Sequence, residues 1–236
     1  MKNRTLIYTF NLAGNKQEVF KLEFDAVTIE LVNKTTSPLP EWARLENNKC
    51  PLCPLDSDEA PYCPLAASIA SVVKQFQNII SHDQIFLQVE TDERIVSQKT
   101  TAQRALSSFM GVVMAISGCP HTAFFRPMAR FHLPLASEEE TIYRSTSMYL
   151  LAQYFRVREG GETDFSLAGL EKIYKNIQVI NTAIVERLRG ASKGDSSVNA
   201  IIMLDMYAQI MPFVIEDALE DIRYLFAPYL IENSAG

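Results

Sequence analysis

Apolar and polar residues alternate with a period of two along the first 32 residues of the chain. The apolar members of this alternation are, in order, Leu6, Tyr8, Phe10, Phe20, Leu22, Phe24, Val27, Ile29 and Leu31. Such alternation turns one set of side chains to each face of a strand, and a glycine-containing turn at 13–15 separates the first two strands. We therefore predict a three-stranded antiparallel meander whose charged face meets water and whose apolar face is covered by helices.

A second alternating stretch lies at 84–98, with a turn near Thr91, and predicts a hairpin that extends the sheet. Elsewhere apolar residues recur every three to four positions, which is typical of helices. The predicted helices cover residues 64–80, 102–116, 137–160, 166–188 and 195–231. Helix-start signals support three of them, namely Pro64, Thr100 or Thr101, and the Ser137–Glu140 capping box.

These patterns together predict an α+β fold in which an N-terminal antiparallel sheet packs on a mostly helical C-terminal half. We expect one domain over 1–236, with the sheet and a cysteine-rich loop in 1–99 and the helical part in 100–236. The chain has 236 residues, of which 47% are hydrophobic, so it can bury one large core.

The cysteine-rich loop departs from both periodicities. Residues 33–63 carry five prolines and three of the four cysteines, Cys50, Cys53 and Cys63, and the fourth is Cys119 in S-G-C-P-H. About thirty irregular residues inside a domain need a feature that holds them in place. The Cys-x2-Cys spacing lets two thiolates of one tight turn reach a single ion, so a four-cysteine metal site is the expected feature.

The spacing leaves the chemistry of this site open. Zinc with four thiolates is the leading interpretation, and an iron–sulfur cluster uses the same ligand type. The C-P-L-C sequence at 50–53 also resembles the C-P-x-C of thioredoxin-type oxidoreductases, over four residues and without a preceding strand. A fourth alternative is four unconnected buried cysteines. A closed four-thiolate set is structural, but His121 is an alternative ligand that could open a position for catalysis.

A second candidate site follows Cys119. Pro127 is expected to start a short helix that sets Arg126 and Arg130 one turn apart, with His132 two residues later. Two guanidiniums and an imidazole suggest a pocket for a carboxylate or phosphate. The competing interpretation is that both arginines form ion pairs with acidic residues.

Charge and motifs narrow the function classes. The net charge of −6 disfavours nucleic-acid binding, and no apolar run reaches the roughly 20 residues of a membrane span. We expect a cytoplasmic protein without a secretory signal, and the common motifs of hydrolases, kinases and dinucleotide-binding enzymes are absent.

Residues 200–215 are apolar nearly all round a helix, which indicates a central core helix or a homodimer interface. The leading hypothesis is therefore a metal-stapled binding or regulatory module that takes a small anionic ligand or a protein partner. The alternative is an enzyme with an anion pocket beside the metal.

Overall fold

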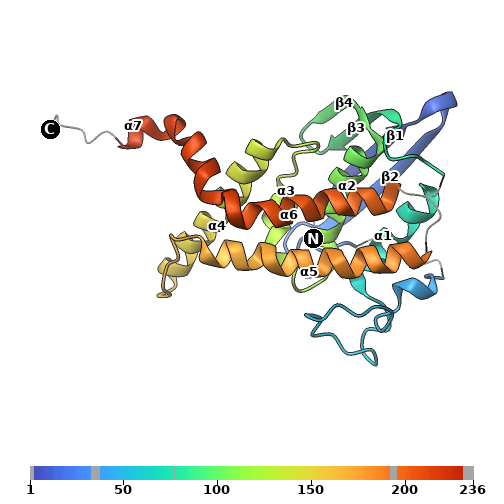
Figure 1. The fold of residues 1–236 in the computed structure, drawn as a ribbon, viewed down its shortest axis with the longest axis horizontal. Coiled ribbons are helices and arrows are strands. Elements are labelled where there is room, and N and C mark those ends of the chain that lie inside the picture. The colour runs from blue at the N-terminus through green and yellow to red at the C-terminus, as the bar shows by residue number, and fades with distance from the viewer. Residues whose placement is uncertain (1–2, 33–37, 77, 192–195, 231–236) are drawn as a thin grey trace.

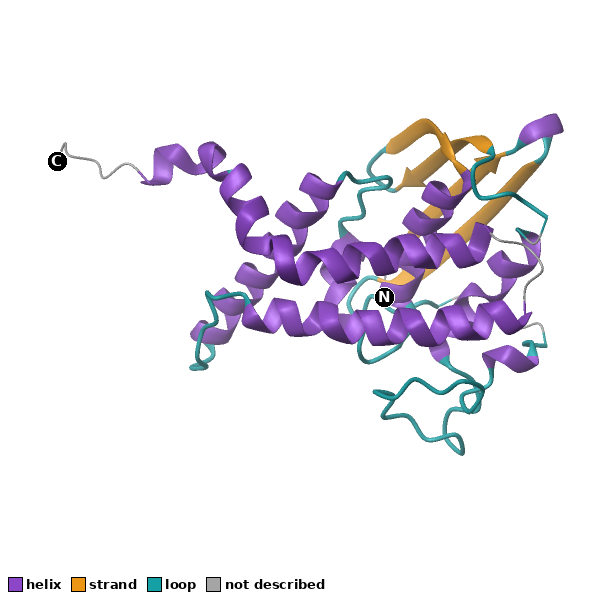
Figure 2. Ribbon diagram, in the orientation of Figure 1, coloured by secondary structure: helices purple, strands orange, loops and turns teal. Residues whose placement is uncertain are grey.

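The computed structural model describes residues 3–32, 38–76, 78–191 and 196–230. Four antiparallel strands form one sheet in the order β2-β1-β3-β4 (Figures 1 and 2). The strands are β1 (Asn3–Asn11), β2 (Gln17–Asp25), β3 (Gln84–Thr91) and β4 (Ile95–Thr101). The α+β class and the hairpin at 84–98 are thus confirmed, since β3 and β4 pair antiparallel and β3 adds to the free edge of β1.

The third strand of the predicted meander is wrong. Within 26–32 the pairing with the sheet is limited to an isolated bridge between Leu31 and Phe24 and to two backbone hydrogen bonds, which join Glu30 to Asp25 and Val32 to Glu23. The carboxylate of Asp25 instead accepts hydrogen bonds from the N–H groups of Val27 and Thr28, each at 2.8 Å, and Ile29 has a positive φ of 55°. These bonds close a turn, so the backbone groups that a third strand needs are already used.

The described residues also form seven α-helices, which follow or separate the strands. They are α1 (Pro64–Gln75), α2 (Ala102–Ile116), α3 (Arg126–Arg130), α4 (Glu138–Arg158), α5 (Ala168–Ala191), α6 (Ser196–Asp221) and α7 (Ala227–Leu230). The predicted caps are present, because Thr101 accepts from the N–H of Arg104 and Ser137 forms a full capping box with Glu140. Among the described helices none is long and apolar enough to cross a membrane.

The helices form a layer on the apolar face of the sheet. The ribbon shows α5 and α6 side by side as a long antiparallel pair, and α6 contacts α2, which in turn contacts α1 and β3 (Figure 1). Aromatic rings pack edge to face in the core. The ring centroid of Phe10 on β1 lies 5.7 Å from that of Phe20 on β2 and 4.9 Å from that of Phe76, which follows α1. Such pairs add about 0.5–1.5 kcal/mol each to the burial of their rings.

Helix α4 does not bury its large apolar side chains. Five of them are exposed, namely Tyr143, Leu150, Leu151, Tyr154 and Phe155. The buried residues of α4 are Ile142, Ser145, Thr146, Tyr149 and Gln153. Ser145, Tyr149 and Gln153 have hydrogen-bond partners inside, as when Gln153 accepts from the N–H of Asp164 at 3.1 Å. The hydroxyl of Thr146 is buried without a partner among the described residues. An apolar helix face is therefore left on the surface.

The predicted interface helix at 200–215 lies within α6. Its described side chains Ala200, Ile201 and Ala208 are buried against α2 and α5, whereas Met206 is exposed. The side chains of 203, 207 and 210–218 lie outside the described residues. The described part of the helix is thus a core element, and the homodimer stays a prediction.

Candidate functional site

Backbone hydrogen bonds join residues near the start of the cysteine-rich loop to residues near its end. The 3-10 turn η2 (Glu41–Ala43) leads into an antiparallel bridge between Arg44 and Tyr62. The N–H of Cys63 donates to the carbonyl of Ala43 at 2.9 Å. Cys63 is the N-cap of α1, and Pro64 follows at the first helical position as predicted. One cysteine is therefore fixed at the start of a rigid helix.

The other cysteines sit on two tight turns. The N–H of Cys53 donates to the carbonyl of Cys50 at 2.9 Å, which closes the Cys-x2-Cys turn. Cys119 follows Gly118, whose positive φ of 89° turns the chain just after the end of α2. The N–H of Cys119 is held by the hydroxyl of Ser117 at 3.2 Å. All four thiols are free rather than paired in disulfides.

All four cysteines line one small cavity of about 30 Å³, together with His121. Four positions of α5 also line it, namely Ile180, Ala183, Ile184 and Arg187. The sequence prediction that Cys119 and the loop cysteines would come to one place therefore has a physical counterpart in a shared cavity. As they stand, however, no three His, Cys, Asp or Glu side chains in the described part of the chain have an arrangement that could hold a metal ion.

The surroundings of the thiols are partly dry. Burial raises the pKa of Cys50, and the nearby thiols of Cys53 and Cys63 add to the increase. Burial also raises the pKa of Cys119 despite hydrogen bonds from the backbone of His121 and Thr122. Without a cation these groups are therefore neutral thiols near pH 7.

Arg187 is a functional candidate that the sequence prediction missed. Its side chain is 2% exposed and donates to three carbonyls of the loop, those of Trp42, Arg44 and Leu45, at 2.6–2.9 Å. No carboxylate among the described residues lies within ion-pair distance of it. Burial lowers its pKa, and the thiols of Cys63, Cys53 and Cys50 are the leading groups that oppose this change.

A signal for Arg187 was present in the sequence. It lies three residues after Ile184 and seven after Ile180, which places its charge on the apolar stripe of α5. A cation on such a stripe requires a partner in the interior. Apolar periodicity includes only apolar residues, so it predicts the stripe of α5 without Arg187.

His121 is oriented by the same loop. Its Nε2 lies 2.6 Å from the carbonyl oxygen of Leu52. A carbonyl only accepts, so Nε2 carries the proton and Nδ1 is left with a lone pair. Metal-ligating histidines commonly donate their second ring N–H to a backbone carbonyl in this way. The role of His121 as an alternative ligand therefore stays open.

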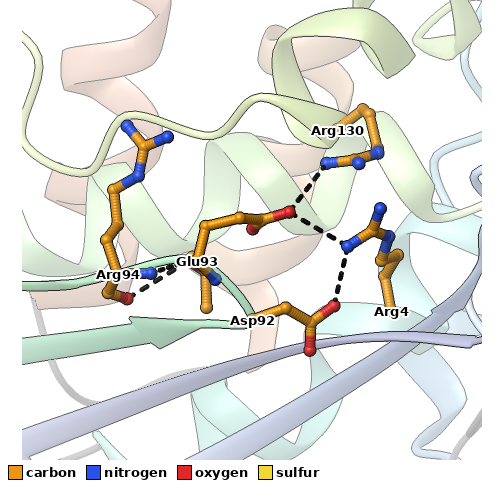
Figure 3. Close-up of polar contacts among 6 residues, drawn as sticks. Arg4, Asp92, Glu93, Arg94 and Arg130 are labelled. Carbon is orange, nitrogen blue, oxygen red and sulfur yellow. Dashed lines mark hydrogen bonds and ion pairs between the residues drawn. The ribbon is translucent and has the colours of Figure 1, made fainter.

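The residues of the predicted anion pocket do not converge. The helix expected at Pro127 exists as α3, but Arg126 forms an ion pair with Glu30 and Arg130 lies 3.7 Å from Glu93. Figure 3 shows Arg130 and Arg4 both directed at the carboxylate of Glu93. Both arginines are thus paired with acids, which the competing interpretation expected.

His132 turns away from these arginines into the interior. Its Nε2 is hydrogen-bonded to the hydroxyl of the buried Tyr8, and the same hydroxyl lies 3.1 Å from Ser108 on α2. Burial and, to a smaller extent, the nearby charge of Arg144 lower the pKa of His132 from 6.5 to about 3. The imidazole is therefore neutral at physiological pH and contributes no positive charge to an anion site.

One family model matches almost the whole chain. It is described as a domain of unknown function, DUF6901, and it covers residues 6–227. The chain belongs to this family. Comparison with curated proteins and with solved structures finds no significant match. The DUF6901 region includes the sheet, all four cysteines and Arg187, so the site described above is part of the family domain rather than an appendage to it.

Proposed function

We propose that the four cysteines of this DUF6901 chain bind one zinc ion, which staples the loop at 41–63 to α1, α5 and the turn after α2. In this proposal the protein is a cytoplasmic binding or regulatory module and the metal is structural. The observation that carries the proposal is the single small cavity lined by Cys50, Cys53, Cys63 and Cys119. Cys-x2-Cys turns joined by distant cysteines are the usual ligands of structural zinc.

The buried guanidinium of Arg187 supports an anionic occupant of this cavity. A buried charge without a partner costs several kcal/mol, on the order given for an ion that leaves water. Four thiolates around one Zn²⁺ carry a net charge of about −2. Such a cluster would supply a close counter-charge to Arg187, for which the carboxylate of Glu46 is a weaker source than the three nearby thiols.

The four cysteines are of a type that zinc prefers and line one cavity, but their side chains would have to converge to hold the ion. No three potential ligands yet stand at coordinating positions in the described residues. Metal binding couples to deprotonation and to local ordering, so cysteine side chains that rotate toward one point are part of the proposed binding step. When bound, the zinc would tie segments that no other covalent link joins.

Elemental analysis of the purified protein, with an optical spectrum, tests the proposal. One zinc per chain without visible absorption is the expected result, and a brown protein with iron and sulfide would favour the iron–sulfur alternative instead. Cys53→Ser and Cys119→Ser should each lower the zinc content and the melting temperature, because binding free energy at a structural site is also folding free energy. His121→Ala serves as the matched variant, since it removes a cavity-lining group without removing a thiol.

Full zinc occupancy and unchanged melting in both cysteine variants would exclude the site. Zinc loss in His121→Ala but not in Cys119→Ser would replace the fourth thiolate by the imidazole and give a site of three thiolates and one nitrogen. Failure of every preparation to hold any metal would leave the thiols as core residues and reject the proposal.

We also propose that the chain forms a homodimer. The exposed apolar face of α4, which carries Leu151, Tyr154 and Phe155, supports it. Contiguous apolar patches on a surface are typical of protein interfaces.

A further inference from the structure

A larger cavity lies in the helical half, apart from the cysteines. Its volume is about 210 Å³, and its walls come from α2, α3, α4, α5 and α6. Most of the lining is apolar, including Gly111, Ala115, Phe125, Met128, Ile177 and Leu204. An apolar cavity of about 150 Å³ is large enough for benzene, so this one can hold a ring with a few further atoms.

The cavity runs along much of the length of α2. Arg104 in the first turn and Ala115 in the last turn of that helix both line it. At a rise of about 1.5 Å per residue these two positions are roughly 16 Å apart along the helix axis. The space is therefore elongated, and its two ends have different chemistry.

The end at the start of α2 is positively charged. Arg104 and Arg144 line the cavity, and neither has a carboxylate within ion-pair distance among the described residues. Arg144 donates to the carbonyls of Met128 and Phe131 at 2.9–3.0 Å, which fixes its guanidinium in place. Arg104 is exposed at the rim, where it reaches the carbonyl of Leu135 at 3.4 Å.

Among the described residues that line the cavity none is an Asp or a Glu, although the whole chain carries a net charge of −6. His132, the other base in this described lining, is neutral near pH 7 because burial and the charge of Arg144 lower its pKa to about 3. Within the described lining the charge of this end therefore comes from the two arginines, and Glu140 on α4 lies near enough to Arg144 to oppose part of it. Guanidinium groups are well suited to bind carboxylates.

The opposite end holds an unpartnered amide. Asn181 is completely buried, lines the cavity, and neither its Oδ1 nor its Nδ2 has a hydrogen-bond partner in the described part of the chain. Its neighbour Ile180 lines the cysteine cavity with Cys119, which follows the end of α2, so Asn181 is at the far end from Arg104. An unsatisfied buried amide is costly and calls for an explanation.

A second side-chain amide on α5, one turn earlier, does have a hydrogen-bond partner. Gln178 lies one turn before Asn181 on α5, and its Nε2 donates to the carbonyl of Ala208 at 2.7 Å. That side chain has a structural partner on α6, whereas Asn181 has none among the residues that the structure describes. An amide offers both a donor and an acceptor, and a hydroxyl group of a ligand can satisfy both.

We propose that this cavity binds a small apolar carboxylate that carries a hydroxyl group at its other end. The carboxylate pairs with Arg144 and Arg104, the hydrocarbon or ring fills the apolar middle, and the hydroxyl pairs with the amide of Asn181. The site is separate from the cysteine cavity, so its test does not depend on the zinc proposal.

Isothermal titration calorimetry on the full chain tests the site with three probes. They are 3-(4-hydroxyphenyl)propanoate, 3-phenylpropanoate, which lacks the hydroxyl, and 3-(4-hydroxyphenyl)propan-1-ol, which lacks the carboxylate. We expect the first to bind the wild type most tightly, with each omission weakening binding about tenfold or more, as the loss of a buried hydrogen bond or charged pair does.

Variants assign each end of the ligand. Asn181→Leu should abolish the preference for the hydroxyl. It should also raise the melting temperature of the free protein, because it replaces an unsatisfied buried amide by an apolar side chain of similar volume. Arg144→Met should abolish the preference for the carboxylate. Since Arg144 also bonds two carbonyls, Arg104→Met at the exposed rim provides a second test that does not disturb the fold.

Several outcomes would overturn the proposal. One is the absence of heat with all three probes at millimolar concentration. A second is equal affinity of the acid and the alcohol, and a third is an undiminished hydroxyl preference in Asn181→Leu. In the first case the cavity is an apolar void whose amide is satisfied by ordered water. In the second case the arginines do not recognise the carboxylate, and in the third case Asn181 does not recognise the hydroxyl.

Discussion

The guanidinium of Arg187 lies 2.6 Å from the carbonyl oxygen of Arg44, across 143 positions of sequence. Together with its bonds to Trp42 and Leu45, this contact fixes the loop to α5. Arg187→Met should lower the free energy of unfolding by about 3–5 kcal/mol, because three carbonyls lose a buried partner. Urea denaturation measures the change.

Arg189→Met is the matched control for that experiment. Arg189 is on the same helix and exposed, so its replacement should change stability by about 0.5 kcal/mol or less. Equal effects of the two substitutions would show that Arg187 does not hold the loop.

The buried His132 should make stability depend on pH. Its pKa is lowered from 6.5 to about 3 in the folded chain, so the unfolded chain binds a proton first as the pH falls. The contribution of the neutral imidazole to the free energy of unfolding is complete above about pH 6.5 and is lost progressively down to about pH 3. By linkage it amounts to a few kcal/mol in total. Asp25 and Asp164, whose pKa values are also lowered, affect stability only below their ordinary value of 3.8.

Denaturation curves between pH 7 and pH 4 test this prediction. His132→Asn should flatten the profile in that window, whereas His82→Asn should leave it unchanged because His82 is exposed. An unaltered slope in His132→Asn would mean that other groups cause the acid sensitivity.

Two glycines of α5 should respond in opposite ways to alanine. A Cβ on Gly169 would lie 2.0 Å from the hydroxyl of Tyr149, which donates to Asp164 at 2.7 Å. Gly169→Ala should therefore cost about 1–3 kcal/mol through overpacking. A Cβ on Gly190 meets nothing within 4 Å, so Gly190→Ala should stabilise the helix by up to about 1 kcal/mol. Thermal melting of both variants decides, and a stable Gly169→Ala would mean that Tyr149 moves aside easily.

Local patterns predicted the elements whose causes are local. The capping box at Ser137 and the hairpin at 84–98 are set by residues only a few positions apart, and both are present. The third meander strand does not form because the side chain of Asp25 accepts hydrogen bonds from the backbone and closes a turn. Side-chain hydrogen bonds of this kind compete with strand pairing, and apolar alternation alone does not predict them.

Of the candidate sites, the sequence predicted only the gathering of the four cysteines, because few chemical roles suit such a cluster. Four cysteines in a chain of 236 residues point to one place, and the structure brings them to one cavity. Arg187 and Asn181 gain their importance from partners that they have or lack after folding, because burial turns a polar group into a costly one. The ion pair between Arg126 and Glu30 likewise joins residues 96 positions apart, which no local pattern reports.

The surface of α4 leads to the last prediction, the homodimer. Leu151, Tyr154 and Phe155 are spaced three and four residues apart, so they share one helix face, and each is more than half exposed. If a second copy covers this face, Leu151→Glu should convert a dimer to a monomer at micromolar concentration, because a charge would be buried in the interface. Light scattering reads the mass directly. Ser147→Glu, an exposed change on the same helix, is the control and should leave the mass of the wild type unchanged. A wild-type chain that is monomeric at that concentration would reject the dimer and leave the face to a different partner.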